Sequence, residues 1–191
     1  MKPKLNVIQR ILLGLGIVGG VCIVSLIGLR LLGLLRDFAT PSDAMAPALS
    51  PGDKVWMEGF TFISRKPARG DIVAFKASGL QFLQERQIYV KRIVGLPREK
   101  VRIADGKLFI NETEVTIRNK AGPIRYLNAP GSQYLSFSDQ RVTVPQDEFF
   151  VLGDNTTNSL DSRYFGFLPR DQVRGRICFC YSPPRNFGPV R

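Results

Sequence analysis

The sequence of 191 residues contains no histidine and only three cysteines. Without histidine, Ser-His-Asp and Cys-His catalytic sites and histidine-ligated metal sites are excluded. Three cysteines are too few for a Cys₄ zinc site, and Cys178 and Cys180 are too close along the chain for an unstrained disulfide. Any acid–base chemistry must therefore depend on lysine, aspartate, glutamate or tyrosine.

Acidic residues are also scarce, with 16 Asp and Glu against 27 Lys and Arg, and the formal net charge is +11. A surplus of this size could attract nucleic acid or anionic lipid head groups. The sequence shows no zinc finger, RNA-binding signature or convincing helix-turn-helix pattern. We therefore expect a lipid bilayer as a partner, and no nucleic acid.

One apolar run supports the bilayer, because residues 11–29 are 19 consecutive residues without charge. That length can cross a bilayer core as a helix. Lys2, Lys4 and Arg10 precede the run, so the positive-inside tendency puts the N-terminus in the cytoplasm. A cleaved signal peptide is the alternative, but the run is long for one and no small-x-small site directly follows it. The sequence thus predicts a cytoplasmic tail (1–10), a single transmembrane anchor (11–36) and an extracytoplasmic β-rich domain (37–191) with a variable insertion (about 99–148).

The domain after the anchor is predicted to be mainly β, because no stretch has a long helical period. Asp105-Gly106 between two alternating runs predicts a β-hairpin over residues 101–110. Residues 78–87 and 111–138 are expected to be loops. Trp56, Phe60 and Phe62 could belong to the core or to an apolar rim that touches the bilayer. Further strands are predicted at residues 55–62, 72–75, 88–95, 141–144, 149–152 and 176–181.

Lys91 stands in the middle of the strand predicted at residues 88–95. Side chains alternate along a strand, so Tyr89, Lys91 and Ile93 share one face. A lysine in apolar surroundings loses hydration of its ammonium form, so its pKa falls and a neutral amine becomes available as a base. The alternative is an edge-strand lysine that reaches water or opposes aggregation.

A second informative stretch, residues 153–166, is rich in Gly, Asn, Asp and Ser and is predicted to be a loop. Short polar side chains in such a loop can bond one another and hold a fixed shape. A hydroxyl such as that of Ser159 can fix the rotamer of a nearby amine, and Asp161 and Arg163 could pair. The alternative is a turn-rich connection with no chemical role.

Four segments of the chain, spanning residues 41–166 in order, carry a resemblance to a known family. Together they resemble type I signal peptidase, the membrane-anchored serine–lysine endopeptidase family, whose domain is a coiled β-sheet of the signal-peptidase and LexA type. The segments are Pro41-Ser42-x-x-Met45-x-Pro47-x-Leu49, Gly70-Asp71-Ile72-Val73-x-Phe75, Tyr89-Val90-Lys91-Arg92-Ile93-Val94-Gly95-Leu96-Pro97 and Gly153-Asp154-Asn155-x-x-Asn158-Ser159-x-Asp161-Ser162-Arg163-x-x-Gly166.

The resemblance implies removal of N-terminal signal peptides from exported preproteins at a plasma or thylakoid-type membrane, without metal or organic cofactor. It implies a role for each matching residue. These are Lys91 as general base, Ser159 as the residue that orients it, Asp161 and Arg163 as support, Ser42 as an oxyanion-hole donor, and Met45, Pro47 and Tyr89 as substrate-binding residues.

The position of the family's nucleophilic serine is occupied here by Ala44. Alanine has no hydroxyl, so no acyl-enzyme can form at this position. An engineered change, a natural paralogue that binds without cutting, and a rerouted reaction, for example through Ser42, are the open explanations. The rival class is a non-catalytic signal-peptide-binding or regulatory subunit. A LexA-like self-cleaving repressor is a third candidate, disfavoured by the apolar run and by the lack of a DNA-binding motif.

Overall fold

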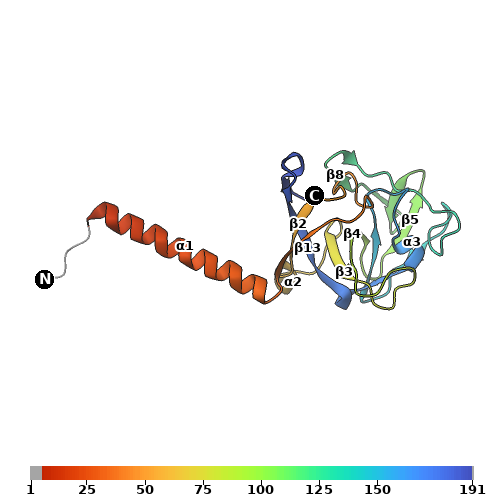
Figure 1. Ribbon diagram of the computed structural model, residues 1–191. Helices are drawn as coiled ribbons and strands as arrows, with labels where there is room; N and C mark the ends of the chain where they lie inside the picture. The colour runs from red at the N-terminus through yellow and green to blue at the C-terminus, as the bar shows by residue number, and fades with distance from the viewer. Residues whose placement is uncertain (1–5, 191) are drawn as a thin grey trace.

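The computed structural model describes residues 6–190, and in it one long helix extends from the side of a β domain (Figure 1). Lys2 and Lys4, used above to predict topology, lie outside the described residues. The helix, α1 (Val7–Leu31), is capped at its start by Asn6. The Asn6 side chain accepts a hydrogen bond from the backbone N–H of Gln9, and the Gln9 side chain accepts one from the backbone N–H of Asn6. The chain turns away after the helix at Gly33, with φ +69°. By length and composition α1 could span a membrane.

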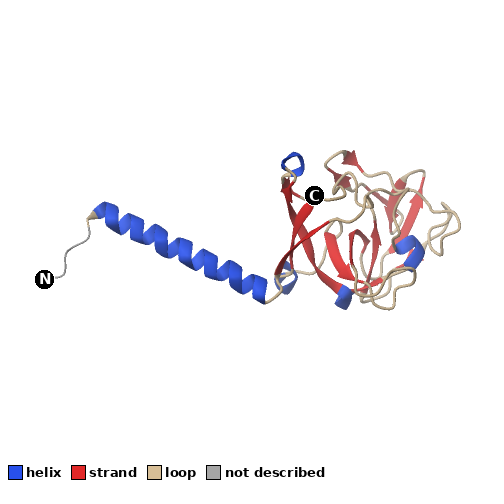
Figure 2. Ribbon diagram, viewed as in Figure 1, coloured by secondary structure: helices blue, strands red, loops and turns tan. Residues whose placement is uncertain are grey.

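The β domain is built on one antiparallel sheet, which confirms the predicted mainly β class (Figure 2). The strand order is β1-β2-β13-β3-β4-β11-β12, with β14 paired to β13. Segments far apart in sequence are therefore neighbours, since β13 lies between β2 and β3. The strands of this sheet are β1 (Leu35–Ala39), β2 (Lys54–Glu58), β3 (Ile72–Lys76), β4 (Ile88–Gly95), β11 (Glu148–Leu152), β12 (Leu168–Pro169), β13 (Val173–Ser182) and β14 (Gly188–Pro189).

A smaller sheet of order β10-β5-β6-β7 covers one end of the domain. Its β5–β6 hairpin is the one predicted from the sequence, and Asp105 and Gly106 take φ of 52° and 78° at its turn. The remaining elements are β5 (Lys100–Ala104), β6 (Lys107–Ile110), β7 (Thr113–Val115), β8 (Arg118–Asn119), β9 (Gly122–Pro123), β10 (Val142–Thr143), α2 (Thr61–Ser64), α3 (Ser162–Phe165), η1 (Arg170–Gln172) and η2 (Pro184–Asn186).

The strand predicted at residues 55–62 is shorter than expected, because β2 ends at Glu58. The Glu58 carboxylate accepts a bond of 2.9 Å from the Thr61 amide, and the chain turns into α2. Phe60 and Phe62 therefore do not continue the strand. Trp56 and Phe60 are exposed, as the rim alternative required, whereas Phe62 packs partly against the core.

Two of the hydrophobic clusters lie on opposite faces of β3 and β4. Ile72 and Ala74 face the cluster that contains Met45 and Leu49, while Val73 and Phe75 face the cluster that contains Phe149, Val151 and Phe165. Since β3 is buried on both faces, its residues form a continuous apolar run.

The central sheet leaves one interval beside β4. Strand β3 pairs with β4 from Ile88 to Arg92, but β11 pairs with β4 only from Arg92 to Gly95. In residues 6–190, the first half of β4 is thus paired on one side only, and β1 is paired only with β2. A cavity of about 620 Å³ lies between these strands, lined by Phe38, Ala39 and Pro41 from one side and by Ile88 from the other.

Candidate active site

Lys91 occupies a buried position in β4, with 4% of the residue exposed. The β4–β11 register pairs Arg92 with Leu152, so Lys91 comes beside Gly153, the next residue after β11. Burial is the main cause that lowers the pKa of Lys91 from 10.5 to about 8. The Asp161 carboxylate opposes that shift and the Arg163 guanidinium adds to it. A substantial neutral fraction is therefore present at mildly alkaline pH.

Gly153 is the point at which the Lys91 strand, Ser159 and the segment around Ala44 meet. A Cβ on Gly153 would lie 2.5 Å from the Ala44 carbonyl oxygen and would also collide with the Ser159 hydroxyl. Only glycine permits this approach. The structure thus brings Ser159 and the Ala44 backbone together at Gly153, which follows the strand that pairs with the Lys91 strand.

The segment that carries Ala44 is held against the polar loop by hydrogen bonds. The backbone N–H of Asn155 donates to the Ala44 carbonyl oxygen at 3.1 Å, and the Asn158 side chain donates to both Asp43 carboxylate oxygens at 3.1 Å. Ala44 itself is buried, and Ser42, two residues earlier, is exposed. A methyl group therefore stands where the loop and the β4 lysine converge.

Asp161 and Arg163 form a buried ion pair, with a 2.8 Å contact and side chains at most 3% exposed. Asp161 also accepts bonds from the backbone N–H groups of Gly153 and Arg163. The remaining Arg163 donors reach the carbonyl oxygens of Leu127 and Thr156 at 2.9 and 2.8 Å. Because these charges are saturated with partners, the loop around Ser159 is held in a fixed shape.

A second buried ion pair was not predicted from the sequence. Arg92 binds Asp154 through two contacts of 2.7 Å and donates a third bond to the Gly70 carbonyl oxygen. Asn119 donates to the same carboxylate at 3.2 Å. The pair joins β4 to the start of the polar loop. Its only sequence signal is an arginine on an apolar strand and an aspartate after a buried one.

The Ser159 hydroxyl is buried and, within residues 6–190, has no hydrogen-bond partner. The Tyr126 hydroxyl is likewise buried without a partner. Buried hydroxyls are normally paired. The Ser159 oxygen is therefore available to a nearby amine or to a bound group.

The three predicted substrate-binding residues have different environments. Met45 belongs to the core cluster with Leu49 and is 4% exposed. Pro47 is exposed, after a cis Ala46–Pro47 peptide bond. Tyr89 stacks on Phe75 with ring centroids 5.9 Å apart, and its hydroxyl accepts a hydrogen bond from the backbone N–H of Gln84. The three side chains thus lie in different surroundings, one in the core, one exposed and one stacked on a β3 ring.

The arrangement is suited to proton transfer at a backbone carbonyl. A largely desolvated amine, a hydroxyl without a partner and two saturated ion pairs surround one buried backbone position. Among residues 6–190, no cluster of carboxylates or thiols is arranged to hold a metal ion. Asp43, Gly153 and the Arg92–Asp154 pair complete the site, and they were not assigned to it from the sequence.

Comparison with known proteins gives consistent results. Residues 12–182 match the family described as "Signal peptidase, peptidase S26". A probable signal peptidase I-2 from Synechocystis is 34% identical over 149 residues, covering 78% of this chain and 63% of the relative. A signal peptidase I from Leptolyngbya laminosa is 30% identical, covering 88% and 79%. Thylakoidal processing peptidase 1 from Arabidopsis thaliana is 35% identical, covering 79% and 43%.

A crystal structure of a signal peptidase I from Enterococcus faecalis is 32% identical and covers 59% of this chain and 97% of that one, with a TM-score of 0.44. The match spans less than two thirds of the Synechocystis and Arabidopsis relatives. The family match itself extends over most of the chain, from the first part of α1 to the end of β13. The chain therefore belongs to the signal peptidase family, peptidase S26.

Proposed function

We propose that this chain recognises the N-terminal signal peptides of exported preproteins, and that Ala44 prevents it from cutting them. The observation that carries the proposal is the burial of Lys91 beside Gly153, where Ser159 and Ala44 also meet. The lowered pKa of Lys91 supports its role as a base, and the buried Ser159 hydroxyl without a partner in residues 6–190 is the group proposed to orient it. The missing part is the attacking oxygen.

The bound peptide would lie extended between β1 and the first half of β4. Both strands offer backbone groups on that side, and an added strand can pair with them. The cavity lined by Phe38, Ala39 and Ile88 leads along this interval. Small side chains near the cut site would fit a groove whose floor is already filled by core residues.

With a hydroxyl at position 44, the expected reaction is acyl transfer. The neutral Lys91 amine takes the hydroxyl proton while the oxygen attacks the scissile carbonyl, and Ser159 holds the amine in place. The Lys91 ammonium then gives a proton to the leaving amine as the peptide C–N bond breaks, and a water molecule hydrolyses the ester that remains. The exposed Ser42 hydroxyl would donate to the oxyanion that develops. In the present chain the methyl group of Ala44 can do none of this, so the base has nothing to activate.

The same proposal places α1 across a plasma or thylakoid-type membrane and the β domain outside the cytoplasm. The helix is long and apolar enough, and Arg10 near its start agrees with a cytoplasmic N-terminus. Trp56 and Phe60 are exposed on the domain and would touch the head-group region. The catalytic groups would then lie near the surface where signal peptides leave the bilayer.

The second candidate is a natural regulatory or binding subunit, and Ala44 is the observation that favours it. Saturated buried pairs at Asp161 and Asp154 are still present. They are the supports that a functional base requires. We therefore favour a recent or engineered loss of the nucleophile over a long-standing non-catalytic role.

The test is cleavage of a preprotein in detergent micelles by the full chain and by Ala44→Ser. We expect binding without cleavage from the present chain and cleavage from the variant, an increase of roughly 10⁴-fold or more. The matched control is Ala46→Ser, which adds a hydroxyl two residues away. Binding with no cleavage by Ala44→Ser would support the regulatory subunit, and failure of both chains to bind would contradict the proposal.

A further inference from the structure

The cavity between β1 and β4 has a basic as well as an apolar lining. Next to α1 it is lined by Gly33 and Arg36, and its lining also includes the basic residues Lys76 and Arg174. The three basic residues come from three different strands, β1, β3 and β13. Arg36 folds back over the turn after the helix, with Nη2 2.9 Å from the place of a Cβ on Gly33. The three basic side chains therefore line one cavity because of the fold, and not because they are close in sequence.

The three cations lack a protein counter-ion. Among the described residues, none of them forms a salt bridge, in contrast to Arg65, Arg69 and Arg176 on neighbouring elements. The one acidic residue that lines the cavity, Asp37, pairs with Arg30 at 3.0 Å and accepts a bond from the Tyr181 hydroxyl at 3.1 Å. An excess of positive charge around a cavity favours an anion from outside the chain.

The position of the cavity narrows the source of that anion. Arg30 is in the last turn of α1 and the cavity lining begins at Gly33, so Arg36 lies within a few residues of the membrane-length segment. Arg174 is near the same turn, because the place of a Cβ on Gly59 is 3.1 Å from the Arg174 carbonyl oxygen and 3.6 Å from the Leu34 side chain. Trp56, which is opposite Asp37 in the β1–β2 register, contacts Tyr181 and Phe179. Aromatic side chains beside the end of a spanning helix are typical of the head-group level.

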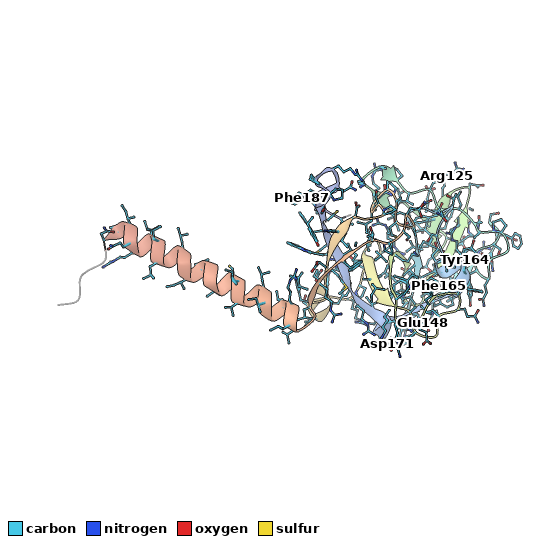
Figure 3. All side chains as sticks on the ribbon, in the orientation of Figure 1. Arg125, Glu148, Tyr164, Phe165, Asp171 and Phe187 are labelled. Carbon is cyan, nitrogen blue, oxygen red and sulfur yellow. The ribbon has the colours of Figure 1, made fainter. Side chains whose placement is uncertain are left out.

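The same side of the domain carries further apolar groups. Phe187 is exposed and packs edge-to-face on Phe179, and it lies on the side of the domain from which α1 extends (Figure 3). A surface that combines exposed aromatic rings with unpaired cations matches a bilayer that offers acyl chains and phosphates together.

We propose that Arg36, Lys76 and Arg174 form a binding site for the phosphodiester of an anionic membrane lipid. The head group enters the cavity from the helix end, its phosphate contacts the three side chains, and its acyl chains remain in the bilayer beside α1. The part of the cavity lined by Ala39, at the end of β1 away from α1, stays open for an extended peptide. The site holds the domain at a fixed tilt on an anionic leaflet and requires neither peptide binding nor catalysis.

An acidic peptide is the other ligand class with the right charge. The position favours lipid, since Arg36 and Arg174 lie near the end of the spanning helix, where phosphates are present at high local concentration. Free inorganic phosphate has the same chemistry as the head group but no acyl chains. Competition among the lipid, inorganic phosphate and an acidic peptide for binding to the chain distinguishes these ligands.

The experiment uses the full chain in an uncharged detergent, titrated with dihexanoyl phosphatidylglycerol or dihexanoyl phosphatidylcholine. Trp56 is the single tryptophan of the chain, so its fluorescence reports binding close to the site. We expect the anionic lipid to bind at least tenfold more tightly than the zwitterionic one. The difference should shrink as the salt concentration rises.

The variant Arg36→Gln/Lys76→Gln/Arg174→Gln should lose that preference. The matched control, Lys100→Gln/Arg118→Gln/Arg170→Gln, removes the same charge from exposed residues that do not line the cavity and should keep it. Native mass spectrometry of each chain should find the anionic lipid retained by the unaltered and control chains only.

Four results would overturn the proposal. One is equal affinity of the unaltered chain for the two lipids, which needs no variant. Another is equal loss of the preference in the control triple variant. Inorganic phosphate that competes as well as the lipid would assign the site to a free anion, and an aspartate-rich peptide that displaces the lipid at lower concentration would assign it to peptide.

Discussion

The two halves of the candidate site differ in how complete they are. The half built from β4 and the polar loop has a buried lysine, a hydroxyl and two buried ion pairs with nearly every donor and acceptor engaged. The half built from the segment before β2 is held just as firmly, through Asp43 and the Ala44 carbonyl, but presents only a methyl group. The two halves are thus held equally firmly but differ in the chemistry of the side chains they present.

The half that contains Lys91 also costs folding free energy, because it buries charged groups. A lysine that is 4% exposed destabilises the folded state whenever it is protonated, and ion pairs buried this deeply offset their desolvation only when fully hydrogen-bonded. Such groups stay in a protein when function requires them.

The first prediction concerns Lys91 once an attacking hydroxyl is present. In the Ala44→Ser background, Lys91→Met should lower kcat by about 10⁴-fold or more, because the hydroxyl then has no base. In the Ala44 background the same change should leave signal-peptide affinity within about threefold. Single-turnover cleavage and equilibrium binding are the two measurements. Cleavage that survives Lys91→Met would show that another group is the base.

The second prediction concerns the ion pair behind the loop. Asp161→Asn leaves the Arg163 charge buried without its partner and should lower the free energy of unfolding by about 3–5 kcal/mol. The matched control is Glu112→Gln, which removes the exposed partner of Arg141. Urea denaturation should show little change for that control. Equal effects of the two variants would mean that the loop is not held by its buried charge.

The third prediction uses the pKa of Lys91. Below pH 8 the side chain is protonated in both states, and burial makes that costly only in the folded one. Between about pH 8 and 10.5 the unfolded chain binds more protons, so the folded state gains stability as pH rises. Above pH 10.5 the amine is neutral in both states, so burying it no longer destabilises the folded state.

Lys91→Met should therefore stabilise the chain at pH 7 by about 3 kcal/mol, given 1.36 kcal/mol for each pKa unit. The advantage should shrink steadily as pH rises from 8 to 10.5. Thermal or urea unfolding of both proteins across this range is the measurement. A constant difference at every pH would show that packing, and not the ammonium charge, is responsible.

The smallest effect is expected at Ser159. Its hydroxyl has no partner in the described part of the chain, so Ser159→Ala should change the free energy of unfolding by no more than about 1 kcal/mol. In the Ala44→Ser background, however, it should reduce kcat about 10- to 100-fold, because the amine loses the group that orients it. A loss of stability comparable to that of Asp161→Asn would contradict the assignment.

Sequence patterns predicted the parts of the molecule that depend on local order. The apolar run became α1, the hairpin turn at Asp105 formed as expected, and Lys91 is buried. Strand β2 was predicted too long, because the side-chain cap from Glu58 outweighs the β propensity of Phe60.

The contacts that sequence reasoning missed are non-local. Arg92 and Asp154 are 62 residues apart, and Asp43 meets Asn158 across 115 residues. Such contacts depend on the crossing of β13 between β2 and β3 and on the close approach at Gly153, and no local pattern encodes either. Family resemblance assigned Ser159, Asp161 and Arg163 to one site, but it did not include these supports.

The most direct test of the account is a titration of Lys91 in the full chain. Site-selective NMR of the lysine side-chain CH₂ groups, assigned by comparison with Lys91→Met, would follow its ionisation. The account predicts a midpoint near pH 8, about 2.5 units below the ordinary value of 10.5. A midpoint at or above 10 would mean that the amine is solvated and charged at working pH, and the proposed base would not exist.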